Sequence, residues 1–244
     1  MKIEEAAKNW TELGKDDPMW LVLTDETKRG NKWSEEDFFA TGRAQIQDVL
    51  RQVKDSGLQV NFGAALDFGC GLGRLSQALA SHFQHVDGVD ISQSLIDQAR
   101  RFNRFTNKVE YHINIKTDLN LLPKSHFDFI LSLIALQHIP SKHQLLYIAA
   151  FMEALKPGGV AFFQTVHTRG LRSWVPNWFV ERVRQTRSRG KCYIPMYGVP
   201  APHVLRLVEQ HGCALQKFSA EDFDNSPSRF GSDTFIVVKR PAKN

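Results

Sequence analysis

The sequence contains few cysteines and no long apolar run. Its 244 residues include three cysteines, and their spacing matches neither a disulfide framework nor a set of metal ligands. No stretch approaches the roughly 18 apolar residues of a membrane-spanning helix. The N-terminal stretch, MKIEEAAKNW, is charged and lacks the apolar core of a secretory signal. These absences predict a cytoplasmic protein with no membrane span and, since the histidines add no zinc-site spacing, with no metal.

One stretch carries more information than the rest, namely residues 64–76, which read AALDFGCGLGRLS. A short apolar run ends in Asp67, three glycines follow at alternate positions, and an apolar helical pattern then begins. This order predicts a buried strand, a tight turn and the start of a helix. Glycine allows positive φ and the close approach of a ligand to the backbone, and the first turn of a helix offers free N–H groups. We therefore expect a ligand-binding loop that contains Gly69, Gly71 and Gly73.

Strands and helices alternate along the rest of the chain, which indicates an α/β fold. Strands joined by helices form a doubly wound sheet, mainly parallel, in which ligands bind beyond the carboxyl ends of the strands. A chain of 244 residues suits one domain of this kind. The pattern predicts strands that end at residue 68 and that span 86–89, 109–113, 127–133, 160–166, 215–218 and 234–239, with helices at 75–83, 92–105, 142–155 and 202–211.

We expect this single domain to have four parts. Residues 1–57 form a helical N-terminal extension that covers the ligand, and its main helix spans 34–55, with Ser34 and Asp37 in a pair that resembles a capping box. The Asp16-Asp17-Pro18 sequence interrupts any helix before it. The other parts are a ligand-binding core at 58–167, a substrate-side insertion at 168–200, and a C-terminal helix with the final strands at 201–244.

Two acids specify the ligand of the glycine loop more closely. Asp90 ends the next strand, where a carboxylate accepts hydrogen bonds from both hydroxyls of a ribose. Asp67 precedes the loop, and an acid there suits an ammonium group better than a phosphate; the alternative is that it caps the following helix. Arg74 stands where the nicotinamide fingerprint requires glycine, and no lysine–serine pair follows to bind a triphosphate. The residues therefore predict a ligand with a ribose and a cationic amino-acid end.

Four motifs occur in the order LDFGCGLGRLS, VDGVDIS, FDFILSLIALQHIP and LKPGGVAFFQ, and they cover about residues 60–167. In this order they resemble the class I S-adenosylmethionine-dependent methyltransferases, especially the small bacterial type 11-like branch. The resemblance implies a Rossmann-like sheet of seven strands, mostly parallel, with an antiparallel last strand. It also implies S-adenosylmethionine as the cofactor and S-adenosylhomocysteine as the product.

The resemblance also implies the residues of the cofactor site. Asp67 is expected near the ammonium of the cofactor, Asp90 at the ribose and Ile91 against the adenine. Asp118 matches a position that often lies near the adenine amino group; the alternative is that it stabilises a turn. The methionine end is expected to lie against Gly69, Cys70, Gly71, Gly73, Leu133, Ala135 and His138. Leu119 is expected beside Asp118. By position alone, Phe38, Thr41 and Arg43 are expected to cover the cofactor.

Methyl transfer needs a positioned acceptor and, for a hydroxyl or a protonated amine, a base. His138, at the end of the fourth strand, is the first candidate base, and the alternative is that it hydrogen-bonds a backbone carbonyl. His167, at the end of the fifth strand, is the second candidate. Aromatic residues of the insertion either orient the substrate or pack as a lid. The insertion is expected to contact the substrate through Arg169, Trp174, Tyr193 and Tyr197.

The acceptor is inferred from charge and from missing motifs. Residues 169–191 hold seven cations and one acid, so this segment carries a net charge of +6 and leaves −1 for the rest of the chain. The sequence has no [DN]-P-P-[YF] motif, which disfavours exocyclic amines, and no Pro-Cys pair, which disfavours pyrimidine C5 chemistry. We predict transfer to an oxygen or nitrogen of a small-molecule or carbohydrate-type acceptor, in which an anionic group would meet the arginines. The alternative functions are an RNA methyltransferase that uses this segment and a non-catalytic cofactor-binding scaffold. For the segment itself, the alternative is a solvated helix face that binds nothing.

Overall fold

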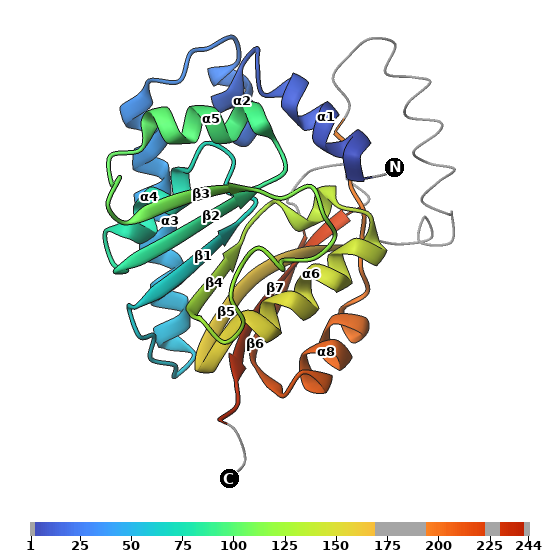
Figure 1. Ribbon diagram of the computed structural model, residues 1–244. Helices are drawn as coiled ribbons and strands as arrows, with labels where there is room; N and C mark the ends of the chain where they lie inside the picture. Colours follow the sequence, from blue (N-terminus) through green and yellow to red (C-terminus); the bar gives the residue numbers. More distant parts are fainter. Residues whose placement is uncertain (1–2, 169–193, 223–229, 242–244) are drawn as a thin grey trace.

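The computed structural model describes residues 3–168, 194–222 and 230–241, and a sheet of seven strands forms its centre (Figure 1). The strand order is β3-β2-β1-β4-β5-β7-β6. Neighbouring strands from β3 to β5 are parallel, whereas β7 is antiparallel to both β5 and β6. The predicted fold class and the antiparallel last strand are therefore confirmed. The strands span Ala64–Phe68 (β1), His85–Asp90 (β2), Val109–Ile113 (β3), Phe127–Ser132 (β4), Leu155–Thr168 (β5), Cys213–Asp222 (β6) and Phe230–Lys239 (β7).

Helices cover both faces of the sheet (Figure 1). One face packs against α3, α4 and α5 around Val49, Leu79 and Ile96, and the other packs against α6 and α8 around Phe151 and Val204. None of the helices in the described part of the chain is long and apolar enough to cross a membrane. The helices are Ile3–Leu13 (α1), Pro18–Val22 (α2), Glu35–Asp55 (α3), Arg74–Ala80 (α4), Gln93–Phe102 (α5), Ser141–Ala154 (α6) and Ala201–Gln210 (α8), with 3-10 turns at Glu26–Lys28 (η1) and Leu136–His138 (η2).

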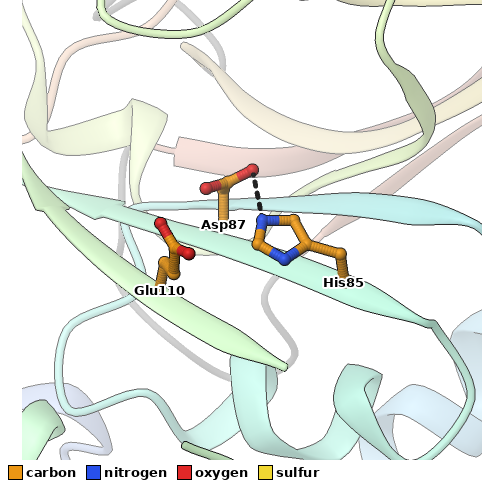
Figure 2. Close-up of side chains that lie close together, drawn as sticks. All are labelled: His85, Asp87 and Glu110. Carbon is orange, nitrogen blue, oxygen red and sulfur yellow. Dashed lines mark ion pairs between the residues drawn. The ribbon is translucent and has the colours of Figure 1, made fainter. Parts of the chain in front are cut away.

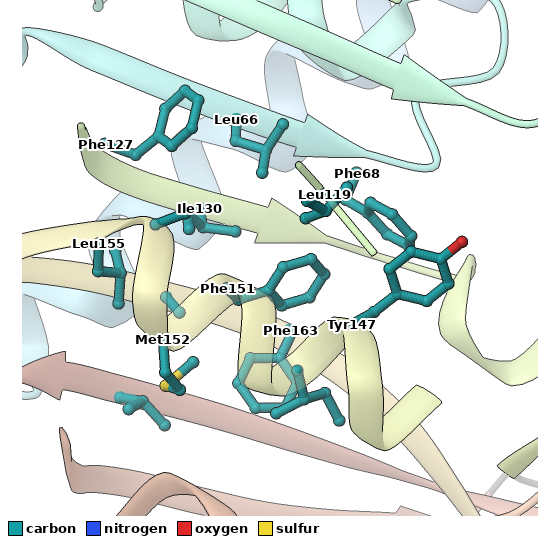
Figure 3. Close-up of a cluster of buried hydrophobic side chains, with 14 of the residues drawn as sticks. Leu66, Phe68, Leu119, Phe127, Ile130, Tyr147, Phe151, Met152, Leu155 and Phe163 are labelled. Carbon is teal, nitrogen blue, oxygen red and sulfur yellow. The ribbon is translucent and has the colours of Figure 1, made fainter. Parts of the chain in front are cut away.

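The core between the sheet and α6 is rich in aromatic side chains (Figure 3). The ring of Phe68, on β1, lies 4.6 Å from that of Tyr147 and 5.1 Å from that of Phe151, measured between centroids. Phe163 of β5 stacks on Phe235 of β7. Burying each such phenylalanine contributes about 1.5–3 kcal/mol. This packing holds the carboxyl end of β1, where the glycine loop begins, against α6.

The N-terminal residues form helices even though their apolar periodicity is weak. α1 and α2 are separate helices: Asp16 and Asp17 lie between them and Pro18 begins α2, so the sequence interrupts the helix as predicted. The carboxylate of Asp17 caps α2 by accepting the N–H of Trp20. α3 begins directly after Ser34, whose hydroxyl accepts the N–H of Asp37, as the capping pattern predicts. In the described part of the extension, the main helix predicted at 34–55 is therefore joined by α1 and α2.

Several element boundaries differ from the prediction. α4 ends at Ala80 rather than at residue 83, and β6 spans Cys213–Asp222 rather than 215–218. The start of β5 differs as well. β5 begins at Leu155 rather than after the glycine pair, so Pro157-Gly158-Gly159 lies within the strand instead of separating it from α6. The pairing of β5 with β4 shifts register between Phe127 and Phe129. Gly158 has φ = +79° at this irregularity. Because glycine adopts this conformation without a steric penalty, the strand can kink and remain paired.

Candidate active site

The loop between β1 and α4 adopts a conformation that requires glycine. Gly69 has φ = +79°, and a Cβ at this position would collide with the Cβ of Ala135. Gly73 has φ = +76°, and a Cβ there would collide with the hydroxyl of Tyr111. A larger residue at either position would therefore both strain the backbone and overlap a neighbour. The loop places its backbone at the carboxyl end of β1, as the sequence predicts.

Asp90 connects this loop to the end of β2. Its carboxylate accepts hydrogen bonds from the N–H of Gly71 over 2.9 Å and from the N–H of Ser92 over 2.8 Å. Burial raises the pKa of Asp90, and these backbone N–H groups partly offset the shift. A carboxylate has about four acceptor positions. The two backbone bonds therefore leave Asp90 with acceptor capacity for the hydroxyls of a ligand.

A cavity of about 150 Å³ opens beyond the carboxyl ends of β1, β2 and β4, where parallel sheets bind ligands. Helices α1 and α2 border it through Trp10 and Val22, and α6 borders it through Tyr147. The sequence prediction placed many of the lining residues in one site. The predicted cofactor residues that line the cavity are Gly69, Cys70, Gly71, Asp90, Ile91, Leu133, Ala135 and His138.

Asp67 lies behind the glycine loop, outside the lining that the described residues form. Its buried carboxylate accepts a hydrogen bond from the hydroxyl of Ser76, on α4, over 2.6 Å. Burial raises the pKa of Asp67 to about 6, while Ser76 and the charge of Arg74 act in the opposite direction. Because side chains alternate along a strand, Asp67 shares with Ala65 the face that packs on α3 and α4. The contact joins β1 to α4 through the Ser76 hydroxyl, and the place of Asp67 near the cofactor ammonium stays a prediction.

Asp118 shapes a turn after β3 and is likewise not among the described lining residues. Its Oδ1 accepts the N–H of Asn120 over 3.0 Å, and its carbonyl accepts the side-chain amide of Asn114 over 2.7 Å. Leu119, the next residue, is buried in the core beside α6. This geometry matches the alternative in which Asp118 stabilises a turn, and it is Asn114 that lines the cavity.

The residues of α3 that the sequence places over the ligand pack elsewhere. Phe38 is fully buried among the N-terminal helices, and the hydroxyl of Thr41 accepts a hydrogen bond from the guanidinium of Arg74 over 3.2 Å. Arg43 lines a second hollow, between α3 and α4. α3 turns this face toward α4, and Gly42 lets its backbone approach the carbonyl of Arg74 closely. The cover over the cavity comes from α1 and α2 instead.

His138 ends η2 and lines the cavity with a defined tautomer. Its Nδ1 lies 2.9 Å from the carbonyl oxygen of Pro195, and because a carbonyl only accepts, Nδ1 carries the proton. Nε2 then holds the lone pair and accepts from the side-chain amide of Gln137 over 3.2 Å. Burial lowers the pKa of His138, so its ring is neutral near pH 7. The two hypotheses for His138, a base and a donor to a backbone carbonyl, are therefore compatible, because the hydrogen bond from Nδ1–H to Pro195 leaves Nε2 unprotonated.

His167, near the end of β5, pairs with Asp233 of β7. Its Nδ1 lies 2.8 Å from Oδ1 of Asp233, whose side chain is almost fully buried. Burial raises the pKa of Asp233, and the interaction with His167 partly offsets the shift. Because a carboxylate only accepts, Nδ1 of His167 carries the proton of this hydrogen bond. His167 is not part of the cavity lining formed by residues 3–168, 194–222 and 230–241.

The structure reaches only the end of the predicted insertion. Tyr197 donates its N–H to the carbonyl of Gln137 over 2.7 Å, and its own carbonyl accepts from the side chain of Gln144 over 2.8 Å. These contacts hold residues 194–200 against η2 and α6, next to His138. The predicted substrate residues Arg169, Trp174 and Tyr193 lie outside the described residues.

Sequence reasoning missed part of the cavity wall. The ring of Trp10, on α1, lies 5.2 Å from the ring of His138, measured between centroids. Asn114 directly follows the carboxyl end of β3 and donates its N–H to the carbonyl of Asp90 over 2.9 Å. The rule that ligands meet strand ends would have identified Asn114. Trp10 carries no such signal, because only the packing of α1 brings it to the site.

Comparison with known proteins agrees with this geometry. A family model described as a methyltransferase domain matches residues 65–159. The ubiquinone biosynthesis O-methyltransferase of Coxiella burnetii is 39% identical over 105 residues, which cover 42% of this chain and 43% of that protein. The protein of the same name from Hydrogenovibrio crunogenus is 33% identical over 167 residues, which cover 68% of each chain. The match therefore spans less than half of the first relative and about two thirds of the second.

Solved structures share the fold. The magnesium protoporphyrin IX methyltransferase of Synechocystis PCC 6803, with bound S-adenosylhomocysteine, has a TM-score of 0.54 and 18% identity, and the match covers 82% of this chain and 84% of that one. The match to the Hydrogenovibrio protein extends over 167 residues at 33% identity, so it is the stronger sign of common descent. On these grounds the chain belongs to the family of class I S-adenosylmethionine-dependent methyltransferases.

Proposed function

We propose that the cavity binds S-adenosylmethionine and that the protein transfers the methyl group to an oxygen of a small molecule, leaving S-adenosylhomocysteine. The observation that carries this proposal is the Asp90 carboxylate, which lines the cavity and is held there by the N–H of Gly71. A strand-end acid bonded to a glycine loop suits the ribose of a nucleoside. Both groups border the same cavity as the neutral His138.

The residues present fit this cofactor. Gly69 and Gly71 line the cavity without side chains, so the methionine end can approach the backbone of the loop closely. Ile91 offers an apolar wall for the adenine beyond Asp90. Asp67 acts from behind the loop, which it supports through Ser76.

A bound sulfonium cofactor supplies an activated methyl group, so the protein's own task is to position the acceptor, exclude water and remove a proton. In the proposed role, an acceptor hydroxyl replaces the Gln137 amide at Nε2 of His138, and Nε2 then accepts the proton of that hydroxyl. Its Nδ1–H stays on the carbonyl of Pro195 and fixes the orientation of the ring. Trp10 covers the ring and limits access of water. His167, held by Asp233, is the second candidate base.

Two observations support a small acceptor that carries an oxygen nucleophile. The curated relatives from Coxiella burnetii and Hydrogenovibrio crunogenus are both named as O-methyltransferases of ubiquinone biosynthesis. The segment 169–191 carries a net charge of +6, which suits an anionic group on the acceptor. We therefore favour a hydroxylated small molecule with an acidic group.

Calorimetry with S-adenosylhomocysteine tests the cofactor site. Asp90→Ala should weaken binding by about tenfold or more, because hydrogen bonds to a charged group are lost. Asp118→Asn is the matched control, since it changes a carboxylate outside the described cavity lining, and its affinity should stay near that of the wild type. Unchanged affinity in Asp90→Ala would contradict the ribose assignment, and a wild type that does not bind would contradict the cofactor assignment.

Labelling with methyl-tritiated S-adenosylmethionine tests the acceptor class. The wild-type protein is incubated separately with an RNA-free extract of bacterial small molecules and with total bacterial RNA. Label in the small-molecule fraction is the expected result. Label in the RNA alone would favour the RNA methyltransferase alternative, and cofactor binding without label in either fraction would favour the scaffold alternative.

A further inference from the structure

Four side chains with metal-binding chemistry meet on strands β2 and β3. Figure 2 shows three of them, His85, Asp87 and Glu110. His85 and Asp87 are two residues apart on β2, and Glu110 and His112 are two residues apart on β3. Alternate residues of a strand share a face, so each pair projects from one side of the sheet. The parallel register pairs Asp87 with Glu110. The two pairs therefore project from neighbouring positions of adjacent strands.

Asp87 is the centre of this cluster. Its Oδ2 lies 3.2 Å from Nε2 of His85, and its Oδ1 lies 2.7 Å from Nε2 of His112. One ligand atom from each of His85, Asp87 and Glu110 lies within 4.8 Å of the other two. A metal ion binds imidazole nitrogen and carboxylate oxygen at about 2.0–2.2 Å, so small side-chain movements would bring all three atoms to one ion.

The surroundings of the cluster favour a cation. The Asp87 side chain is only 8% exposed, whereas those of His85 and His112 are 36% and 29% exposed. Asp87 and Glu110 are like charges at paired positions of adjacent strands, an arrangement that destabilises a sheet unless it is compensated. In the described part of the chain, α6 and α8 cover this face of the sheet toward β5 and β7 (Figure 1). The β2–β3 end is thus accessible to an ion and to the waters that complete its coordination.

We propose that His85, Asp87 and Glu110 bind a zinc ion and that His112 orients Asp87. Calcium and magnesium prefer oxygen ligands alone, whereas zinc accepts both imidazole and carboxylate. In this arrangement Oδ2 of Asp87 faces the ion, and the hydrogen bond from His112 to Oδ1 fixes the carboxylate, as outer-shell partners do in known metal sites. The ion joins β3, the edge strand of the sheet, to β2.

The zinc site is separate from the proposed methyl-transfer site. His85 begins β2 and Asp90 ends it, so the two residues are roughly 16 Å apart along the strand. None of the four cluster residues lines the cavity among the residues that the structure describes. The site therefore stabilises the edge of the sheet and takes no part in methyl transfer.

Titration of the untagged, chelator-treated full-length protein with Zn²⁺ tests the proposal. Calorimetry should show one saturable site in the wild type, and Zn²⁺ should raise the Tm. Glu110→Gln and His85→Gln should each weaken zinc binding by about tenfold or more and reduce the rise in Tm. His203→Gln, which removes an exposed histidine of α8, is the matched control and should behave as the wild type.

Both altered side chains are at least partly exposed, so the variants are expected to fold, and their affinity for S-adenosylhomocysteine provides a check of the fold. That affinity should not depend on Zn²⁺ in any of these proteins. Equal zinc affinity in the wild type and in Glu110→Gln would overturn the proposal, as would the absence of a saturable site. Dependence of cofactor affinity on Zn²⁺ would overturn the separate structural role.

Discussion

The hydroxyl of Ser76 donates a hydrogen bond over 2.6 Å to the carboxylate of Asp67, and this contact joins α4 to β1 behind the glycine loop. Burial raises the pKa of Asp67 from 3.8 to about 6. An acid with a higher pKa in the folded chain than in the unfolded chain binds its proton more tightly when folded. Its protonation therefore stabilises the fold fully below the unfolded value, and this contribution is lost as the pH rises through about 6.

Asp67→Asn should remove this pH dependence. Relative to the wild type, the free energy of unfolding of the variant should rise by on the order of 2–3 kcal/mol between about pH 4 and pH 7. Urea unfolding across this range measures the difference. Ser76→Ala is the control, because it removes the hydrogen bond and keeps the buried acid. A difference between wild type and Asp67→Asn that does not change with pH would show that Asp67 titrates normally.

Gly69 and Gly158 provide a matched pair for the role of the glycine loop. Both have φ = +79°, but a Cβ at Gly158 would meet nothing within 4 Å, whereas one at Gly69 would collide with Ala135. Alanine at either position should cost about 1–2 kcal/mol from backbone strain alone. Gly69→Ala should cost a further 1–3 kcal/mol or so from the overlap, and it should weaken S-adenosylhomocysteine binding.

Denaturant unfolding and calorimetry of the two alanine variants measure these effects. Gly158→Ala should leave ligand affinity unchanged, because it lies inside β5 and outside the described cavity lining. Equal losses of stability and affinity in the two variants would show that the close approach of Ala135 to the loop has no consequence.

His138→Gln should lower kcat by about 10²–10⁴-fold if His138 is the base. Burial lowers the pKa of His138 below 6.5, so wild-type activity should rise with pH through a value below 6.5 and then level off. The variant should lack this acidic limb. The pH profile of kcat/KM, measured with the acceptor identified by labelling, checks both statements. If the pH profile of the variant still shows the acidic limb, a group other than His138 is responsible for it.

Asp233→Asn separates the two candidate bases. The substitution removes the carboxylate that holds Nδ1–H of His167, so it should favour the wrong tautomer of that ring. If His138 is the base, kcat should change little and the variant should mainly lose stability. A fall in kcat as large as that of His167→Gln, with wild-type affinity for S-adenosylhomocysteine, would instead assign the base to His167.

Much of the fold could be predicted because its signals are local. The strand expected at residues 109–113 is β3, and Ser34 caps α3 as its sequence predicts. Apolar alternation and capping depend on residues a few positions apart, and these are visible in the sequence. The start of β5 was predicted wrongly, because pairing with β4 continues past Gly158, which a turn rule treats as an end.

The candidate site could be predicted in part. Asp90 and Gly71 lie together at the cavity because parallel strands end at one edge of the sheet, and the sequence shows where those strands end. The placement of Asp67 and Asp118 depends on which way each side chain points. The sequence motifs name these acids without indicating that Asp67 turns toward Ser76 or that Asp118 closes a turn.

The amino-acid sequence by itself determined the doubly wound sheet, the glycine loop and the acid at the end of β2, since these follow from backbone sterics and local apolar patterns. Only the tertiary structure decided that Trp10 meets His138 and that Asp87 lies opposite Glu110. The reason is physical: these partners are far apart along the chain. Their contacts depend on helix packing and strand register, which the whole domain sets together.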